Sequence, residues 1–567
     1  MARPGPLRLL VAAGVVAARL GAALHAGCSS WGSIHSGPGP QQAGLASGSE
    51  AEPARFKAYN LSVPVDHFHN ESKYEPHSNR SFNLRYWLDT SHYRDGGPVL
   101  VLHSGEAPSD ERLPYLEYGI LAKLAKRTHG VALILEHRYY GTSFPVPNTT
   151  TENLRFLSTE QTLADNAYFA RHVRFPGLEH VNLTAGAAPW IIYGGSYAGS
   201  VAALTRKLYP DAYWGAISSS GVLTAIDDFW QYFEAARHFA PGRCSPVTQK
   251  LTHVVDSMLL SGDKAKARAI KGLFGLADLL DDEFGTTIAG GILGMQSREW
   301  DPAEDSASLG SYCAVITADV PLFASTAHLR PVVGQAVSLA GYDDELETLA
   351  AQMLNYVGYV RDSIRRTRTR SCKGQTLREC LSMRFYESQT GQNPGMFRTW
   401  TYQTCTQWGF FFTGAGTPKD QLSMVSRAIT LEYASILCPL HFNITTRPDV
   451  ESINKLGGFD IRYPRIAFVD GAQDPWRQAG PHAIGQPDRA STASEPFILI
   501  DPGVHHWDEN GLANETEADR GLPPKQVADA QEKEVEFVKA WLQEWDEETG
   551  RRHKGHAAKN VAASPEL

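Results

Sequence analysis

The chain has 567 residues, of which 42% are hydrophobic and 20% are charged. These fractions are typical of a globular protein with a sizeable core, and the length predicts two units or one large α/β unit with an insertion. The net charge of -9 argues against a nucleic-acid partner, and no uninterrupted apolar run is long enough for stable membrane insertion.

The first segment, 1–26, resembles a secretory signal peptide. Two arginines precede an apolar run from Leu9 to Leu24, and small residues that suit cleavage follow, although Arg19 interrupts the run. Residues 27–54 are rich in Gly, Ser, Pro and Ala, which indicates a flexible lead.

Glycosylation and cysteine patterns also favour export. Apart from Cys28, six cysteines remain, an even set that suits an oxidising compartment, with 15 pairings open. Seven N-x-[ST] sequons predict glycosylation at Asn60, Asn70, Asn79, Asn148, Asn182, Asn443 and Asn514. No CxxC pair or HExxH string indicates a metal site, and we expect no cofactor.

The first part of the core is predicted over 55–221. Extended segments at 56–68 and 82–93 favour an antiparallel ribbon, and helical patterns follow at 116–127 and 159–173. Short apolar runs alternate with the helices, which predicts a buried and mostly parallel sheet that binds ligands beyond its carboxyl edge. The runs are 98–102, 131–135, 190–193, 213–218, 466–469 and 497–500.

The segment 222–438 lacks that alternation. It contains helical patterns such as 248–274 and 343–366 together with the six cysteines, so we expect a mainly helical, disulfide-linked insertion that covers the active edge. The alternative is a second helix-rich domain with no role in the site.

The last part of the core is predicted over 439–548. It ends in an amphipathic helix at 523–547, and the charged segment 549–567 indicates a disordered tail.

One stretch, Trp190 to Ser200, combines an apolar run, two glycines, a serine and further small residues before a helical pattern. Strand, tight turn and helix form the context of a nucleophile elbow, which predicts Ser196 as the nucleophile. Gly194 and Ala198 supply the small side chains that the strained turn needs. A phosphate cradle or simple packing is the alternative interpretation of a glycine-rich turn.

The acid and the base are expected after the last two strands. An activated serine needs a base and an orienting carboxylate, and α/β hydrolases place them in the chain order Ser, Asp, His. The acid is Asp470 or Asp474, and the base is His505 or the adjacent His506; spacing leaves both choices open.

Backbone amides must also bind the oxyanion that forms during acyl transfer. We expect the amide of Tyr197 as one donor and an amide of the loop at Gly105 and Glu106 as the other. Glu106 could instead bind a free amine of a substrate, or be an ordinary loop acid.

At these residues the chain resembles the serine peptidase family of lysosomal prolyl-Xaa carboxypeptidase, lysosomal dipeptidyl peptidase and fungal acid prolyl endopeptidases. The matching strings run along most of the chain, and they are V-P-V-D-H-F at 63–68, R-Y-W at 85–87, E-H-R-Y-Y-G-T-S at 136–143, L-S-T-E-Q at 157–161, the elbow, W-T-Y-Q-T-C at 400–405, D-P-W at 474–476 and G-V-H-H at 503–506.

The resemblance implies an α/β-hydrolase core with a helical cap, and cleavage of peptides after proline. It implies the roles of nucleophile, orienting acid and base for Ser196, Asp474 and His505. Trp476 and the aromatic stretch 408–412 could line a proline pocket, although core packing accounts for most such aromatics.

We therefore predict a serine peptidase that is secreted, or lysosomal or vacuolar, and that acts on proline-containing peptides or proteins. A homodimer is compatible with the sequence. The alternatives are an esterase or lipase on the same scaffold, since a fold does not fix the substrate, and a catalytically inactive binding protein.

Overall fold

The computed structural model describes residues 55–302, 304–387, 390, 396–513 and 521–550. The segments predicted as signal peptide and flexible lead, the Asn514 sequon, and the tail from residue 551 lie outside the described residues.

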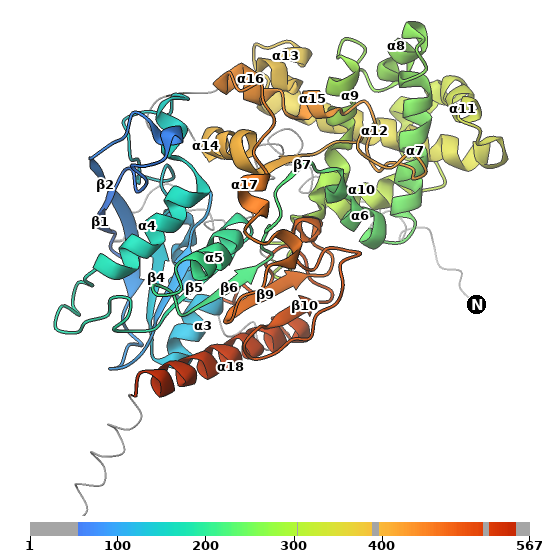
Figure 1. The fold of residues 1–567 in the computed structure, drawn as a ribbon. Coiled ribbons are helices and arrows are strands. Elements are labelled where there is room, and N and C mark those ends of the chain that lie inside the picture. The colour runs from blue at the N-terminus through green and yellow to red at the C-terminus, as the bar shows by residue number, and fades with distance from the viewer. Residues whose placement is uncertain (1–54, 303, 388–389, 391–395, 514–520, 551–567) are drawn as a thin grey trace, which may run out of the picture.

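An eight-stranded sheet forms the centre of the molecule, in the order β1-β2-β4-β3-β5-β6-β9-β10 (Figure 1). The first two strands pair antiparallel with each other and β2 pairs antiparallel with β4, whereas the other neighbours are parallel. The strands are β1 (Tyr59–Pro64), β2 (Ser81–Asp89), β3 (Val99–His103), β4 (Val131–Leu135), β5 (Trp190–Gly195), β6 (Gly215–Ser219), β9 (Ile466–Gly471) and β10 (Phe497–Ile500).

Helices cover both faces of this sheet. The helix α5 (Tyr197–Leu208) packs on β5 and β6 and against α4 (Thr159–His172), while α3 (Gly119–Thr128) and α18 (Lys525–Glu548) pack together on the other face (Figure 1). All side chains of β3, β4 and β6 are buried, as expected for strands covered on both faces. The predicted ribbon, parallel core and terminal helix are confirmed.

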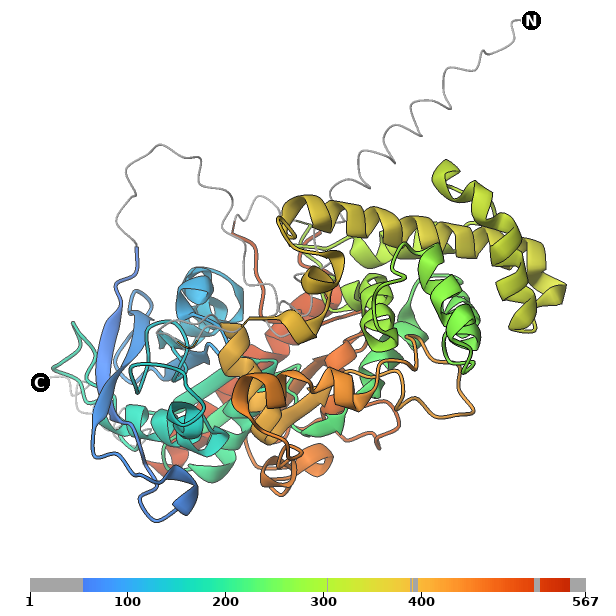
Figure 2. The ribbon, with the colours of Figure 1, turned by 90° about the horizontal axis from the view of Figure 1, so that it is seen from above.

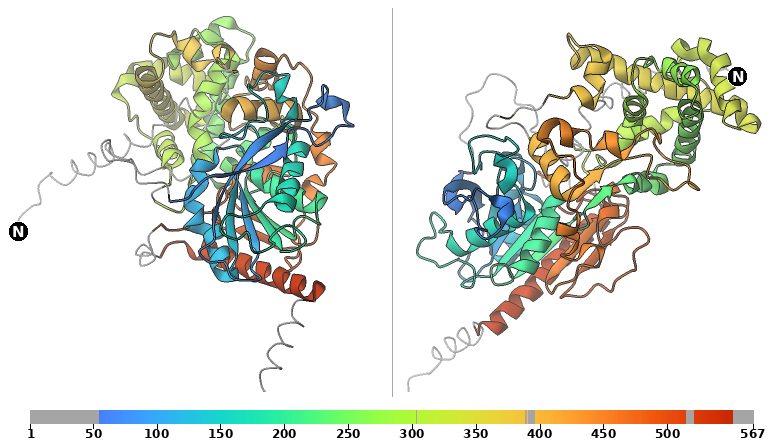
Figure 3. Two further views of the ribbon diagram at one scale, coloured as in Figure 1. Left: turned by 90° about the vertical axis from the view of Figure 1, so that its left-hand side faces the viewer. Right: turned by 45° about the horizontal axis from the view of Figure 1, so that its top comes forward.

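A mainly helical insertion lies between β6 and β9, and most of its helices gather beyond one end of the sheet (Figures 2 and 3). Its helices are α6 (Glu234–Phe239), α7 (Cys244–Leu259), α8 (Lys264–Leu273), α9 (Asp281–Ile288), α10 (Ser308–Ile316), α11 (Arg330–Leu339), α12 (Leu346–Arg370), α13 (Leu377–Leu381), α14 (Met396–Gln403), α15 (Leu431–Ala434), α16 (Leu437–Phe442) and α17 (Glu451–Asn454). Two short strands, β7 (Ile226–Asp228) and β8 (Gly409–Phe411), form a parallel pair within it. With this insertion the molecule has the α/β-hydrolase architecture that the sequence predicts.

The helical pattern at 248–274 is divided in the structure. Helix α7 ends at Leu259 and α8 begins at Lys264, because Gly262 adopts a positive φ of 80° and the Asp263 side chain caps the second helix by accepting a hydrogen bond from the Ala265 amide. Hydrophobic periodicity continues across the turn and therefore did not reveal it.

Three disulfides bind the insertion together, and the sequence had left their pairing open. They join Cys244 to Cys313, Cys372 to Cys380 and Cys405 to Cys438. In the part of the chain that the structure describes, no helix combines the length and apolar character needed to cross a membrane.

Candidate active site

Ser196 occupies the turn between β5 and α5 at the carboxyl edge of the sheet. Its backbone has φ 60° and ψ −129°, a conformation that non-glycine residues rarely adopt. A Cβ at Gly194 would lie 2.1 Å from the carbonyl oxygen of Ala198, so only glycine fits there. The strain predicted for the elbow is therefore present, and the packing that maintains it is visible.

The side chain of Ala198 accounts for the glycine at position 105 on the facing loop. A Cβ at Gly105, on the loop after β3, would lie 3.1 Å from the Cβ of Ala198, and Gly105 also has a positive φ of 65°. The methyl group at 198 thus fits the elbow because the facing loop has no side chain at 105. This contact brings the loop that follows β3 against the first turn of α5.

Asp474 and His505 form a buried pair across the ends of β9 and β10. Asp474 Oδ2 lies 2.8 Å from His505 Nδ1, and Asp474 Oδ1 accepts a hydrogen bond from the Trp476 amide at 2.9 Å. Asp474 and His505 are 1% and 2% exposed. The aspartate therefore fixes the imidazole so that its other nitrogen, Nε2, is left for chemistry.

Asp470 has a different partner. Its Oδ2 lies 2.5 Å from His482 Nδ1, and both side chains are buried. Asp470 is the last polar residue of β9 and is held within its own loop region, whereas Asp474 reaches the histidine loop. Of the two aspartates that the spacing left open, the structure pairs Asp474 with His505.

His506 lies beside His505 but pairs with another acid. Its Nδ1 lies 2.9 Å from Glu509 Oε2, and its amide donates to Ser220 Oγ at 2.9 Å. Burial lowers the pKa of His506, but the Glu509 carboxylate outweighs burial and the pKa is raised overall. A Cβ at Gly195 would lie 3.3 Å from the His506 ring, so this loop packs directly against the residue before Ser196.

His505 Nε2 is buried and has no hydrogen-bond partner among the described residues. No hydrogen bond to Ser196 is present, an arrangement compatible with a site that tightens when substrate binds. Burial lowers the pKa of His505, with Asp474 opposing that effect. The lowered pKa favours the neutral imidazole, which is the form that can accept a proton.

The backbone amides expected to bind the oxyanion differ in whether a protein group already accepts their hydrogen bond. The Tyr197 amide belongs to the first turn of α5, where helix N–H groups lack an acceptor within the helix. The Gly105 amide instead donates to His103 Nδ1 at 3.2 Å. Burial raises the pKa of the Glu106 carboxyl to about 7, opposed by a hydrogen bond from its own backbone amide and by Arg112.

Comparison with known proteins agrees with this geometry. The profile of the family described as "Serine carboxypeptidase S28" matches residues 64–282 and 344–519. The chain belongs to the serine carboxypeptidase S28 family. It is a serine-type peptidase, a hydrolase that acts on peptide substrates.

Several relatives of this S28 peptidase cover most of its length. A protein of Arthroderma benhamiae named "Probable extracellular serine carboxypeptidase" is 46% identical over 496 residues, which cover 86% of this chain and 68% of the relative. The thymus-specific serine protease of Mus musculus is 26% identical over 470 residues, 79% of this chain and 81% of the relative. Among solved structures, proline iminopeptidase of Mycobacterium smegmatis aligns with 85% of this chain and 100% of its own at 12% identity and a TM-score of 0.31.

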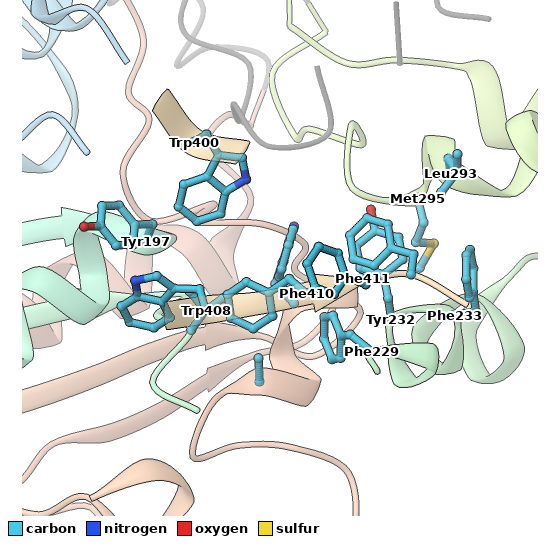
Figure 4. Packing of buried hydrophobic residues seen from close by; sticks show 14 of the residues in the cluster. Tyr197, Phe229, Tyr232, Phe233, Leu293, Met295, Trp400, Trp408, Phe410 and Phe411 are labelled. Carbon is cyan, nitrogen blue, oxygen red and sulfur yellow. The ribbon is translucent and has the colours of Figure 1, made fainter. Parts of the chain in front are cut away.

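Buried aromatic side chains of the S28 peptidase extend from Tyr197, at the start of α5, past Trp408 and Phe410 toward Tyr232 of the insertion (Figure 4). Trp476 is 4% exposed, lies 6.4 Å from the His505 ring between centroids, and contacts the rings of Phe410 and Tyr232 at 5.2 and 5.4 Å. Trp408 lies 5.4 Å from the Tyr197 ring. The sequence identified the 408–412 stretch and Trp476, but it gave no signal for Tyr232, which lies in none of the strings that carry the family resemblance.

Gln403 connects the insertion to the elbow, a role that sequence reasoning missed. Its Nε2 donates to the Tyr197 hydroxyl at 2.7 Å and its Oε1 accepts from the Tyr140 hydroxyl at 2.6 Å. Tyr197 OH also lies 3.1 Å from His137 Nε2. The strings 136–143 and 400–405, which both carry the family resemblance, thus meet at one hydrogen-bonded junction.

One group of described side chains could hold a metal ion. Ligand atoms of Asp66, His69 and His77 lie within 4.8 Å of one another, in the connection between β1 and β2. Asp66 already accepts hydrogen bonds from the Phe68 amide and Gln161, and it pairs with His77 Nδ1 at 2.8 Å. None of these residues belongs to the loops that carry Ser196, Asp474 and His505.

Proposed function

We propose that Ser196, His505 and Asp474 form the catalytic triad of this peptidase, which hydrolyses peptide bonds after proline. The observation that carries the proposal is the buried contact between Asp474 and His505 Nδ1, with Nε2 left unpartnered among the described residues, while the adjacent His506 packs against Gly195, the residue before Ser196. Paired side chains in this order are the arrangement that activates a serine hydroxyl.

The reaction proceeds in two halves. Ser196 Oγ attacks the carbonyl carbon of the scissile bond while its proton moves to His505 Nε2. The carbon–nitrogen bond then breaks, the leaving amine takes that proton, and an acyl-serine remains. Water attacks the acyl group and loses a proton to His505, which returns it to Ser196 Oγ as the bond between the acyl carbon and Oγ breaks, so that the acid and free Ser196 are released. Asp474 stabilises the imidazolium in both halves.

The Tyr197 amide is the first oxyanion donor in this proposal. An amide of the 105–106 loop is the second, and Glu106 suits this role better than Gly105, whose amide is bound to His103. Substrate binding must displace the Glu106 carboxyl from its own amide before that amide can bind the oxyanion.

A proline ring needs a closed apolar pocket, and the aromatic residues around Trp476 are the candidate lining. Trp476 is placed by its amide contact to Asp474 and by its indole N–H, which donates to Gln296 at 2.8 Å. Because the indole is held at both ends, it presents a fixed surface next to the His505 ring.

We further propose that residues 1–26 direct secretion, with a lysosomal or vacuolar destination as the alternative, and that the sequons carry glycans. The "extracellular" name of the fungal relative and the three disulfides support export. Five sequon asparagines are exposed and Asn148 is half-buried; the exposed ones are Asn60, Asn70, Asn79, Asn182 and Asn443. A homodimer also remains a proposal.

Two measurements test the catalytic proposal. A fluorophosphonate should label Ser196 in the native protein and should not label Ser196→Ala, with the labelled peptide identified by mass spectrometry. The native enzyme should cleave a peptide library after proline and should hydrolyse a proline amide in preference to a fatty-acyl ester. Labelling of another residue would refute the triad, and preferential hydrolysis of the fatty-acyl ester would favour an esterase.

A further inference from the structure

A carboxylate and two imidazoles meet in the connection between β1 and β2, at the edge of the sheet (Figure 1). They belong to Asp66, His69 and His77, whose ligand atoms lie within 4.8 Å of one another. Two residues separate Asp66 from His69 and seven separate the histidines, so the set matches neither a CxxC pair nor an HExxH string. The turn that contains the 3-10 helix η1 (Ser72–Tyr74) brings the histidines together, which sequence motifs do not anticipate.

The Asp66 carboxylate is held by neighbouring groups in an orientation that suits a ligand. Its side chain is fully buried, and Oδ1 accepts hydrogen bonds at 2.9 Å from the Phe68 amide and from Gln161 Nε2. The other oxygen, Oδ2, lies 2.8 Å from His77 Nδ1. Donors on one carboxylate oxygen that orient the other are the outer-shell arrangement typical of metal-binding carboxylates.

His69 is the member of the set that simple ion pairing does not explain. The contact between Asp66 and His77 is complete without it, and within the described part of the chain no hydrogen bond reaches the His69 ring. Its ring nevertheless lies beside that of His77, with centroids 5.5 Å apart, and its side chain is exposed. Two adjacent imidazoles repel each other when both are protonated, so a group that binds them in the neutral form stabilises this arrangement.

We propose that Asp66, His69 and His77 bind a zinc ion, with water as the fourth ligand. This site is separate from the proposed triad and does not depend on it. Neighbouring ligands of a tetrahedral zinc ion lie about 3.3 Å apart, so the most distant pair must approach by at most about 1.5 Å. Because His69 is exposed, rotation of its side chain supplies this movement, and the same exposure admits the ion and its water.

The donor set selects zinc over the alkaline-earth ions. Calcium and magnesium bind almost entirely through oxygen ligands, and calcium takes about six to eight of them. The site offers one carboxylate and two imidazoles, a combination that zinc binds tetrahedrally. On binding, zinc replaces the proton shared by Asp66 Oδ2 and His77 Nδ1, and that proton is released to water.

A zinc ion at this place strengthens the link between the β1–β2 connection and helix α4. Gln161 lies on α4, and besides donating to Asp66 its side chain accepts a hydrogen bond from the His67 amide at 3.0 Å. His67 Nε2 in turn lies 2.8 Å from Asp165 Oδ1, also on α4. Since α4 packs on β1 and on α5, we expect the ion to stabilise the connection against local opening.

The first experiment is a calorimetric titration of the whole purified enzyme with zinc chloride after removal of metal with EDTA. Wild-type protein should bind a zinc ion that His69→Gln binds at least about 10-fold more weakly, and calcium should not compete with it. His180→Gln is the matched control, because His180 is also exposed and lies outside the cluster; its affinity for zinc should equal that of wild type. Anomalous diffraction at the zinc edge, from wild-type crystals, should locate the ion between the three side chains.

A second readout reports local opening of the connection. Lys73 lies between the two histidines and its side chain is 47% exposed, so trypsin can cut after it when the connection opens. Zinc at ten times its Kd should slow this cleavage about 10-fold in wild type, because only the closed form binds the ion, and should have no effect in His69→Gln. Fluorophosphonate labelling of Ser196 should be equal in the two proteins, since the cluster lies outside the loops proposed to carry the triad.

The proposal is overturned if zinc binds wild type no more tightly than His69→Gln, or if the anomalous signal lies elsewhere. Equal affinities for zinc and calcium would also overturn it, because they would indicate an oxygen-rich site. The wild-type titration and the diffraction experiment remain decisive even if His69→Gln does not fold. Absence of Ser196 labelling in wild type would instead refute the proposed triad and leave the zinc site unaffected.

Discussion

Two histidines adjacent in sequence have opposite electrostatic surroundings. Burial lowers the pKa of His505, while Glu509 raises that of His506 despite burial. Spacing along the chain could not distinguish them, because the difference comes from partners that only folding brings close. Asp474 lies 31 residues from His505 along the chain, and Glu509 lies three residues from His506 in a loop with no regular periodicity.

Replacement of the orienting acid should separate catalysis from stability. Asp474→Asn keeps the shape but favours the wrong imidazole tautomer, so kcat should fall by about 10⁴-fold. Asp470→Asn is the matched control, because it alters a similar buried aspartate–histidine pair, and its kcat should stay within about 10-fold of wild type. Steady-state kinetics with a prolyl substrate and thermal melts measure both; equal losses of kcat would contradict the assignment.

The pH profile should report the lowered pKa of His505. A general base acts when unprotonated, so a pKa below 6.5 extends activity into the acidic range. The acidic limb of kcat/KM should therefore have its midpoint below pH 6.5, measured on a prolyl amide substrate. A midpoint above 7 would show that the base is not the buried neutral imidazole described here.

At the scale of elements, the sequence predicted the sheet well and the insertion coarsely. Continuous apolar runs such as 98–102 and 131–135 identify strands buried on both faces, because each side chain has a helix to pack against. The insertion gave no such signal for β7, β8 or the π-helix η9 (Thr404–Trp408), which depend on contacts distant in sequence. The loops proposed to carry the triad were predictable, since strand ends fix their place, but the position of Gln403 was not.

The tight turn at Ser196 should not tolerate an added methyl group at Gly194. Gly194→Ala would place its Cβ 2.1 Å from the Ala198 carbonyl oxygen, which must move, so we expect a loss of about 4 kcal/mol or more in stability, or no secreted protein. Gly310→Ala is the control, because it lies in helix α10 with nothing within 4 Å of the new Cβ, and it should be neutral or stabilising by about 1 kcal/mol. Denaturant unfolding and secreted yield are the measurements, and equal stability of the two variants would contradict the steric argument.

At the scale of the whole molecule, buried acids set the pH range of stability. Burial raises the pKa of Asp256 to about 6, of Glu106 to about 7 and of Glu299 to about 8, and it raises that of Asp508. Glu534, on α18, has its pKa raised well above the ordinary value by burial and by the charge of Asp508. Each of these acids therefore holds its proton in the folded state at pH values where the unfolded chain has released it.

Above about pH 6.5, where the histidines of the unfolded chain have lost their protons, stability should consequently fall as pH rises to 8, because the folded state still holds the protons of these acids. Below this range it should fall again, because Arg378 and other partners lower the pKa of Glu283 to about 2 despite burial. Glu534→Gln should raise the melting temperature at pH 8 and leave it nearly unchanged at pH 4.5, with the exposed Glu536→Gln as control. Scanning calorimetry across pH provides the test, and higher wild-type stability at pH 8 than at pH 6.5 would contradict it.

The wide spacing of Ser196, Asp474 and His505 along the chain also bears on biosynthesis. The elbow can form once β5, β6 and α5 have been made, but the Asp474–His505 pair requires β9 and β10, near the end of translation. Until then a nascent molecule has a strained serine without its base. A protease built in this order stays harmless to its own unfinished chain and to its neighbours during synthesis.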